Sequence, residues 1–248
     1  METIAVIFGG RSAEHDISII TALSTIIKPL TLTNKYHVVP VYITKSGEWY
    51  SDSKLSDINN YTKKDISLTL KNLKPISLDL NNGLHLIKSS SFGRQNKTKI
   101  DVVFPSMHGT YGEDGTLMGV LEMADVPYVG CDSASSAVAM NKLLAKKVAS
   151  ASGVEVVKYA DFKKHEYLED QEKVIKDITS KLKFPVFVKP AHLGSSIGIS
   201  RAKDLSELRN ALELAVYYDD VILVEEEVKN LIEVTLPIIG NEKLTPAY

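Results

Sequence analysis

Short apolar runs alternate with helix-like segments over the first half of the chain. The run at 3–8 ends at two glycines and is typical of a strand that is buried on both faces of a parallel sheet. Residues 17–28 carry a helix-like apolar pattern, and further strands are predicted at 38–43, 100–104 and 127–130. This alternation favours an open α/β sheet.

The polar segment at 51–74 interrupts this pattern. It is rich in Ser, Asn, Asp and Lys, and we expect a solvated insertion there. The apolar runs 76–80 and 84–87 follow, separated by Asn81-Asn82-Gly83. Asn-Gly between two such runs predicts a β-hairpin.

The second half of the chain begins with a strong helical pattern. Asp204 followed by Glu207 resembles the capping box that begins a helix, and apolar residues follow at helical spacing. No internal repeat or low-complexity tract is evident. The other elements expected here are helices at 135–152 and 171–183 and strands at 184–189, 221–227 and 233–239.

Composition and charge exclude several classes of protein. The 248 residues have a formal net charge of −2, which argues against nucleic-acid binding through a basic surface. No apolar run approaches the roughly 20 residues of a membrane helix, and no secretory signal precedes the first strand. The single Cys131 cannot form an intrachain disulfide, and the histidines lack metal-ligand spacing. We therefore expect a reduced cytoplasmic protein.

The first candidate motif runs from Gly9 to Ser18. Its two glycines allow a sharp turn at the sheet edge where α/β proteins bind ligands, although the dinucleotide pattern G-x-G-x-x-G is absent. Glu14 falls near the first turn of the following helix. It can contact a ligand or act as a helix-terminus carboxylate, and the spacing favours neither.

The second motif, 107–115, follows a predicted strand and contains three glycines, one histidine and two acids. His108 can donate to a substrate carboxylate or a phosphate, or it can be a structural residue of a glycine-rich turn. Glu113 and Asp114 can equally cap a helix at 116–124.

The third motif, 188–198, places Lys189 at a strand end before Gly-Ser-Ser-x-Gly. Backbone N–H groups, hydroxyls and an ammonium suit an anionic ligand, although the lysine precedes the loop, unlike in the G-x-x-x-x-G-K-[ST] pattern. An exposed turn is the structural alternative.

Two weaker features complete the candidates. Lys142 and Lys146 lie one turn apart on a predicted helix, a spacing that by itself indicates a solvated face. The acids 225–227 at a strand end can accept ribose hydroxyls beside an adenine, or can simply be exposed. No G-x-S-x-G elbow supports hydrolase chemistry.

Together, and in this order, these motifs resemble those of the D-alanine–D-alanine ligase family of the ATP-grasp superfamily. The resemblance covers the chain apart from 51–98, and Asn141 replaces the family's more usual Asp. The motifs that carry it are Gly9 to Ser18, His108 to Gly115, Met140-Asn141-Lys142, Val188 to Gly198 and Glu225 to Glu233.

The resemblance implies an α/β ATP-grasp fold in three parts. An N-terminal, substrate-binding open parallel-sheet domain would occupy 1–137, and a central α+β ATP-grasp subdomain would occupy 138–226. The C-terminal ATP-grasp subdomain would begin at 227–248. ATP would be held between the central and C-terminal parts.

The resemblance also implies a reaction and its residues. ATP phosphorylates the carboxylate of one D-alanine, and the amine of a second attacks the acyl phosphate to give D-alanyl-D-alanine for peptidoglycan precursors. In the first-substrate site, Glu14 would hold the ammonium through a network with Ser195, and His108 would help to neutralise the carboxylate. The ATP site would comprise Lys142, Lys189 and Ser196 at the phosphates, Glu225 with the backbone of Glu226, Glu227 and Val228 at the adenine, and Glu233 at the ribose.

The family pattern continues beyond the last residue, Tyr248. The mobile loop, the phosphoryl-stabilising Arg and the ligands of Mg²⁺ (or Mn²⁺) would follow there, so we expect a C-terminally truncated ligase that is inactive in this form. We also expect residues 221–240 to leave an exposed sheet edge.

Two alternatives remain beside a D-alanine–D-alanine ligase. They are a D-alanine–D-lactate ligase and a non-catalytic nucleotide-binding module, whereas a Rossmann dehydrogenase lacks its motif. By the same resemblance, the expected partners are D-alanine, ATP and a second copy of the chain, with no nucleic acid and no membrane.

Overall fold

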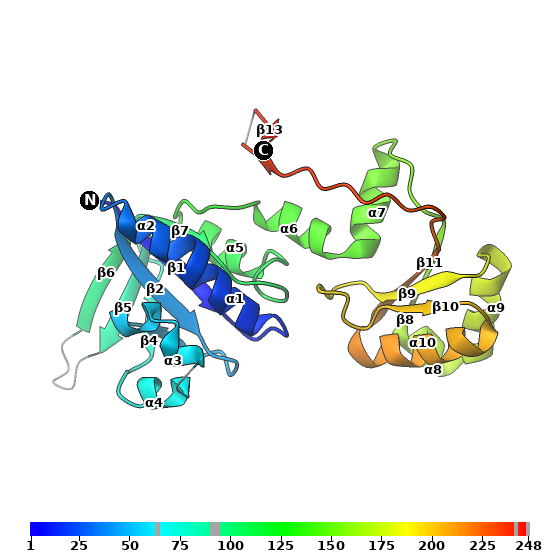
Figure 1. The fold of residues 1–248 in the computed structure, drawn as a ribbon, viewed down its shortest axis with the longest axis horizontal. Helices are drawn as coiled ribbons and strands as arrows, with labels where there is room; N and C mark the ends of the chain where they lie inside the picture. Colours follow the sequence, from blue (N-terminus) through cyan, green and yellow to red (C-terminus); the bar gives the residue numbers. More distant parts are fainter. Residues whose placement is uncertain (63–64, 90–94, 241–242, 247–248) are drawn as a thin grey trace.

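A parallel sheet forms the first unit of the computed structural model, which describes residues 1–62, 65–89, 95–240 and 243–246. Its four strands are β1 (Thr3–Gly9), β2 (His37–Ile43), β3 (Trp49–Ser51) and β7 (Val102–Pro105). In the order β3-β2-β1-β7, β1 is parallel to β2 and β7, and β3 is antiparallel to β2. The open parallel sheet expected from the sequence is present at one end of the molecule (Figure 1).

Strand β1 supplies both hydrophobic cores of this unit, because successive side chains of a strand point to opposite faces. Ala5 and Ile7 pack in the cluster on the side of α5 (Thr116–Met123). Val6 and Phe8 pack in the cluster on the opposite face. A strand covered on both faces is apolar throughout, which explains the uninterrupted run near the N-terminus.

One continuous helical segment, residues 15–32, covers the face of Val6 and Phe8. It consists of α1 (His15–Thr21), the π-helical η1 (Ala22–Ile27) and α2 (Lys28–Leu32). The helix predicted at 17–28 is confirmed and is longer than predicted.

The polar segment at 51–74 is not a solvated insertion. It contains the short helices η2 (Ser53–Ser56), α3 (Asn59–Thr62) and α4 (Ile66–Leu70), while residues 63 and 64 lie outside the described part. Leu55 is fully buried in the same cluster as Phe8. The prediction was wrong because a few apolar side chains among many polar ones are sufficient to dock these helices.

The predicted hairpin is confirmed. The pairing of Asp79 with His85 leaves residues 80–84 as the turn, in which Asn82 and Gly83 both have positive φ angles, 58° and 105°. The hairpin belongs to a three-stranded antiparallel sheet of β4 (Ile76–Asp79), β5 (Leu84–Ser89) and β6 (Gln95–Ile100).

The run at 100–104, predicted as one strand, is divided between two sheets. The Asp101 carboxylate accepts a hydrogen bond from the Thr3 amide at 2.9 Å, and the Asp101 amide donates to the Thr3 carbonyl at 3.0 Å. These bonds turn the chain, so that β6 ends before Asp101 and β7 begins after it. The strand predicted at 127–130 is reduced to a single parallel bridge between Val103 and Tyr128.

The helix predicted at 135–152 is two helices, α6 (Ser133–Met140) and α7 (Lys142–Ala151). Asn141 between them has extended backbone angles, φ −88° and ψ 103°. Its Oδ1 accepts hydrogen bonds from the amides of Leu143 and Leu144 at 3.1 and 3.0 Å, which makes Asn141 the N-cap of α7. Apolar spacing alone does not detect a cap within a helical pattern.

The second unit is an antiparallel sheet in the order β10-β9-β11-β8, with helices packed on one face (Figure 1). Its strands are β8 (Tyr159–Lys163), β9 (Val186–Pro190), β10 (Ser200–Ala202) and β11 (Val221–Glu226). Its helices are α8 (Lys164–Glu169), α9 (Gln171–Lys181) and α10 (Leu205–Tyr218).

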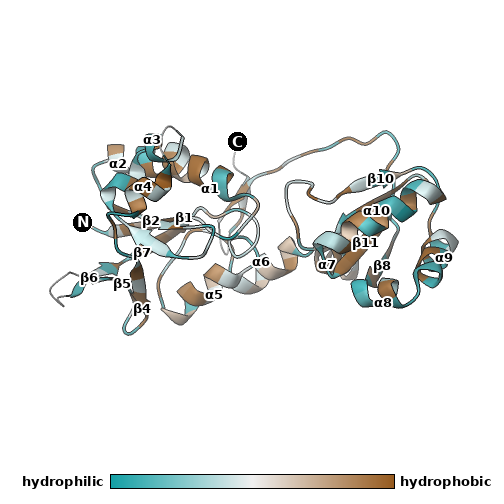
Figure 2. Cartoon of the chain, turned by 90° about the horizontal axis from the view of Figure 1, so that it is seen from below, coloured by the Kyte–Doolittle hydropathy of each residue, from teal (hydrophilic) through white to brown (hydrophobic). Residues whose placement is uncertain are grey.

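Polar and apolar residues alternate along α10, as Figure 2 shows. Leu208 and Leu212 are fully buried against the sheet. The predicted start of this helix is confirmed, because Asp204 Oδ1 accepts a hydrogen bond from the Glu207 amide at 2.9 Å. None of the described helices is long and apolar enough to cross a membrane.

The expected exposed edge at 221–240 is wrong for its first part, because β11 pairs with β9 on one side and β8 on the other. The strand predicted at 233–239 is reduced to β12 (Ile238–Ile239), which pairs with β13 (Thr245–Pro246). Residues 231–237 are exposed and irregular. The domain limits at 137 and 226 stay predictions.

Replacing Leu212 with Ala should lower the free energy of unfolding by about 2–5 kcal/mol, because the side chain fills the core of the second unit. The matched Leu214→Ala, on the same helix but 43% exposed, should change it by less than about 0.5 kcal/mol. Urea denaturation followed by far-UV circular dichroism measures both. Equal losses would contradict this packing.

Candidate functional site

The glycine-rich loop between β9 and β10 extends from the second unit toward the first (Figure 1). The hydroxyl of Ser195 in this loop donates a hydrogen bond to the carboxylate of Glu14, which directly precedes α1. Two residues predicted to share the first-substrate site, 181 positions apart, are therefore in contact.

Two glycines leave room for the Glu14 carboxylate. A Cβ on Gly194 would lie 2.9 Å from Glu14 Oε2, and a Cβ on Gly109 would clash with the same oxygen. Gly109 also has a φ of +69°, in the left-handed region that favours glycine. The motifs at 107–115 and 188–198 therefore both contact Glu14 through a glycine.

The loop that contains His108 is closed by its own acids. Glu113 Oε2 accepts a hydrogen bond from the Gly109 amide at 2.7 Å, and Asp114 Oδ1 accepts one from the Thr116 amide at 3.0 Å, at the start of α5. His108 Nε2 lies 3.1 Å from Thr21 Oγ1. The loop thus places His108 next to Gly109, which lies against Glu14.

Lys189 and Glu225 meet on the face of the second sheet opposite α8, α9 and α10. Val186 and Val188 of β9 point into the helix-covered core, so Lys189 points to the opposite face. On β11, Glu225 lies one diagonal step from Lys189 in the register of the two strands. The Lys189 ammonium donates to Glu225 Oε2.

A second lysine binds the same carboxylate. Lys146 Nζ lies 2.7 Å from Glu225 Oε1, and these two side chains are only 12% and 11% exposed. The spacing of Lys142 and Lys146 was compatible with a solvated helix face, and for Lys146 that interpretation is wrong. Lys142 and Lys146 are separated by about one helical turn, and this spacing is the sequence feature that could have indicated that both face the site.

Burial alone would raise the pKa of Glu225, but hydrogen bonds from Lys146 and Lys189 outweigh it and hold that pKa below its ordinary value. In the structure the Glu225 carboxylate binds two lysines, and its expected place beside adenine stays a prediction.

Lys142 completes this cluster of cations. Its ammonium donates to the carbonyl of Leu193 in the glycine-rich loop. Burial lowers the pKa of Lys142, and the neighbouring Lys189 lowers it further, against the opposing effects of Asp219 and Glu225. An added anion would therefore stabilise the charged form of Lys142.

The loop itself has unusual backbone geometry. Ser195 and Ser196 have φ angles of 47° and 57°, a conformation that costs L-residues about 1–2 kcal/mol each. Within the loop, the Ile197 amide donates to the Gly194 carbonyl at 3.0 Å. The conformation brings the Ser195 hydroxyl to Glu14 and leaves Ser196 next to it in the same turn.

The remaining predicted residues lie at and after the end of β11. The Glu226 carboxylate accepts from the Lys183 amide at 2.9 Å, and Glu227 binds Arg201 at 2.6 and 2.9 Å. Val228 and Glu233 lie in the exposed segment that follows. The structure therefore brings Glu14, Ser195, Lys142, Lys189 and Glu225 close to one loop, whereas the adenosine roles of Glu225, Glu226, Glu227, Val228 and Glu233 stay predictions.

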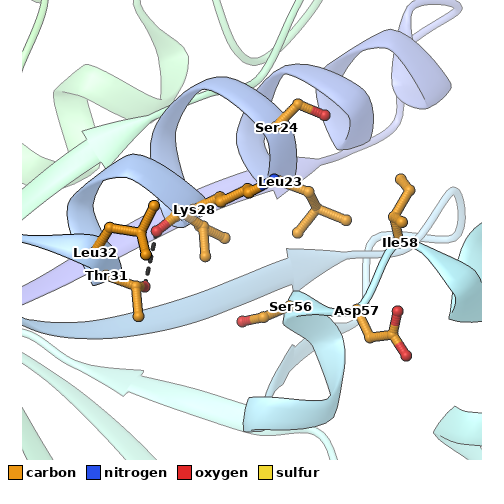
Figure 3. A pocket seen from close by; sticks show the side chains of 9 residues that line it. Leu23, Ser24, Lys28, Thr31, Leu32, Ser56, Asp57 and Ile58 are labelled. Atoms are coloured by element: carbon orange, nitrogen blue, oxygen red, sulfur yellow. Dashed lines mark hydrogen bonds between the residues drawn. The ribbon is translucent and has the colours of Figure 1, made fainter.

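A separate cavity of about 470 Å³ lies between the 15–32 helical segment and residues 56–58 (Figure 3). Its lining includes none of the predicted site residues and consists of the apolar Leu23, Ile27, Leu32 and Ile58 and the polar Ser24, Lys28, Thr31, Ser56 and Asp57. Across the described residues, no three His, Cys, Asp or Glu side chains are grouped to hold a metal ion.

In the second unit, helices cover one face of an antiparallel sheet, and the lysine-lined loop of this sheet contacts the first, α/β unit. This arrangement is that of an ATP-grasp protein, and solved structures of this class match the chain. The VanG D-Ala:D-Ser ligase of Enterococcus faecalis is 37% identical with a TM-score of 0.81, covering 99% of this chain and 68% of that one. The D-alanine–D-alanine ligase of Helicobacter pylori is 26% identical, also with a TM-score of 0.81, covering 100% and 74%.

The sequence matches are more specific. The models described as D-ala D-ala ligase N-terminus and C-terminus match residues 3–131 and 148–247. The chain belongs to the D-alanine–D-alanine ligase family. D-alanine–D-alanine ligases of Chloroherpeton thalassium and Natranaerobius thermophilus are 41% and 38% identical over 97% and 96% of this chain. The chain spans 65% and 63% of the lengths of these two relatives.

Replacing Glu225 with Gln should lower the free energy of unfolding at pH 7 by about 2–3 kcal/mol, because two ammonium groups lose their shared charge. The loss should be complete above about pH 4.3, the ordinary glutamate pKa, and should shrink as the pH falls through the lower pKa of the folded state. Urea denaturation across pH measures it. A pH-independent difference would contradict the ion-pair assignment, and the exposed Glu213→Gln is the control.

Proposed function

We propose that the protein that carries this chain joins two D-alanines at the expense of ATP, to give D-alanyl-D-alanine for peptidoglycan precursors. The contact of Glu14 with Ser195 beside the lysine-lined loop is the observation that supports this most directly. It brings a carboxylate suited to an amino-acid ammonium next to a loop suited to phosphate. Membership of the D-alanine–D-alanine ligase family supports the same reaction.

Glu14 holds the ammonium of the first D-alanine in this proposal. Its carboxylate is half-buried, and Gly109 and Gly194 press against it without side chains. The ion pair orients the substrate so that its carboxylate faces the loop, with His108 contributing positive charge or a hydrogen bond. The Ser195 hydroxyl fixes the position of Glu14 relative to the phosphates.

Lys142 and Lys189 hold the ATP phosphates, with Ser196 and the loop amides as further donors. Phosphoryl transfer requires mainly alignment and charge neutralisation, which this set of groups supplies. The carboxylate oxygen of the first D-alanine attacks the terminal phosphorus and ADP leaves. The amine of the second D-alanine then attacks the acyl carbon and phosphate leaves.

The adenosine is assigned to the end of β11. Glu226, Glu227 and Val228 provide backbone groups for adenine, and Glu233 accepts ribose hydroxyls. The amides of Glu226 and Glu227 already donate to the carbonyls of Lys158 and Pro185, at 3.1 and 2.9 Å, so the carbonyl groups and the Val228 amide are the backbone groups left for adenine. Mg²⁺ or Mn²⁺, when bound, would neutralise phosphate charge.

The alternatives differ in their products. The relatives and structures reported above are named as D-alanine–D-alanine or D-Ala:D-Ser ligases, so none of them favours D-lactate as the second substrate. A non-catalytic module would bind ATP without D-alanine-dependent phosphate release. We also infer a cytoplasmic homodimer from the family, which size-exclusion chromatography with light scattering tests.

ATP binding tests the phosphate site. Lys142→Met and Lys189→Met should each weaken ATP binding at least about tenfold, because each removes a charge-assisted contact. Lys147→Met, on the same helix but 52% exposed, should bind like the wild type. Isothermal titration calorimetry with ATP measures all three. Equal affinities would contradict the assignment of the loop to phosphate.

Steady-state kinetics of the full-length protein test the ligation. Glu14→Gln should lower kcat/KM for D-alanine by about 100-fold or more, because the substrate ammonium loses its ion pair. The ATP affinity should change by less than about twofold, and exposed Asp16→Asn is the control. Phosphate release and dipeptide formation are followed together. ATP binding without D-alanine-dependent release in the wild type would favour the non-catalytic module.

A further inference from the structure

A chain of side-chain hydrogen bonds joins the glycine-rich loop to the break between α6 and α7. Asn141 Nδ2 lies 2.9 Å from His192 Nε2, and His192 Nδ1 lies 2.9 Å from Asp219 Oδ1. The chain therefore connects the N-cap of α7, the start of the loop and the C-terminal end of α10. The roles proposed above use none of these three side chains.

The helix cap determines which atom of Asn141 faces His192. Because Asn141 Oδ1 accepts the amides of Leu143 and Leu144, the amide nitrogen is the atom directed to the ring. An amide nitrogen can only donate, so His192 Nε2 must accept. The ring proton then lies on Nδ1 and is donated to Asp219. A single tautomer of His192 satisfies every bond of the chain.

Asp219 provides a fixed end. Its side chain is only 7% exposed, and its Oδ2 also accepts the His192 amide at 2.7 Å. Burial alone would raise the pKa of Asp219, but hydrogen bonds from His192 and Val221 outweigh it and hold that pKa below its ordinary value. A carboxylate that is held at several points is a rigid anchor for the ring.

Lys142 directly follows Asn141, and both its backbone amide and its side-chain ammonium are hydrogen-bonded to the same loop. Its amide donates to the Ala191 carbonyl at 2.9 Å, and its ammonium donates to the Leu193 carbonyl. Residues 191 and 193 flank His192. Any shift of the loop relative to α7 would therefore move Lys142 away from its position beside Lys189.

We propose that Asn141, His192 and Asp219 are positioning residues of the phosphate site, which hold Lys142 and the loop in register. This inference rests on the proposed function. It also gives a reason for Asn at 141, where the family more usually has Asp: a carboxylate there offers no hydrogen to Nε2 of this tautomer. The three residues act through Lys142 and the loop rather than on the nucleotide.

Two substitutions test the link without removing the cap or the lysine. Asn141→Ser keeps a good N-cap but lacks the Nδ2 amide group that reaches His192, and His192→Gln removes the ring. Each should weaken ATP binding roughly 3- to 10-fold, the equivalent of one lost hydrogen bond, while Tm changes by less than about 3 °C. The same substitution at an exposed histidine, His165→Gln, should leave the affinity unchanged.

A spectroscopic measurement separates positioning from general support of the fold. Long-range ¹H–¹⁵N correlation spectra of the wild-type chain should show His192 with a protonated Nδ1 and a bare Nε2, and Asn141→Ser should shift the Nε2 resonance, because it removes the hydrogen bond to that nitrogen. A protonated Nε2 in the wild type, or unchanged ATP affinity in both variants, would overturn the inference. A wild-type chain that shows the expected tautomer but binds no ATP would instead overturn the proposed function and, with it, the positioning role.

Discussion

The site depends on holding several lysines close together in a folded protein. Two ammonium groups 4 Å apart near a protein surface repel by about 4 kcal/mol, so such a cluster needs an internal anion. Glu225 is that anion: it lies in a central strand, its carboxylate is almost fully buried, and it binds both Lys146 and Lys189. The alternation of β9 and β11 places Lys189 and Glu225 on the sheet face opposite α8, α9 and α10, and Lys146 reaches Glu225 from α7.

The glycine-rich loop is fixed at two points. Near its tip, Ser195 donates to Glu14 in the first unit, and near its base, His192 is held between Asn141 and Asp219. Two consecutive serines with positive φ persist because these attachments outweigh the local backbone cost. The loop thus keeps one geometry relative to both the Glu14 carboxylate and the lysines.

Strands, turns and helix caps that follow from local sequence patterns could be predicted, whereas features that depend on side-chain contacts in the folded protein could not. The buried run at 3–8, the Asn-Gly hairpin and the Asp204 cap follow from periodicity and turn chemistry, and all are confirmed. The division of the helix at Asn141 was missed because a cap is formed by a side chain turned onto its own backbone. Lys146 was missed because its partner, Glu225, is distant in sequence.

The same contacts explain why the site is costly without a ligand. Glu225 already binds Lys146 and Lys189, whereas Lys142 is left with a carbonyl and a pKa lowered by burial and by Lys189. Folding therefore places a partly buried ammonium where its charge is disfavoured, and a bound anion would remove that cost. The positive charge that destabilises the empty site is thus the feature that would favour an anion there.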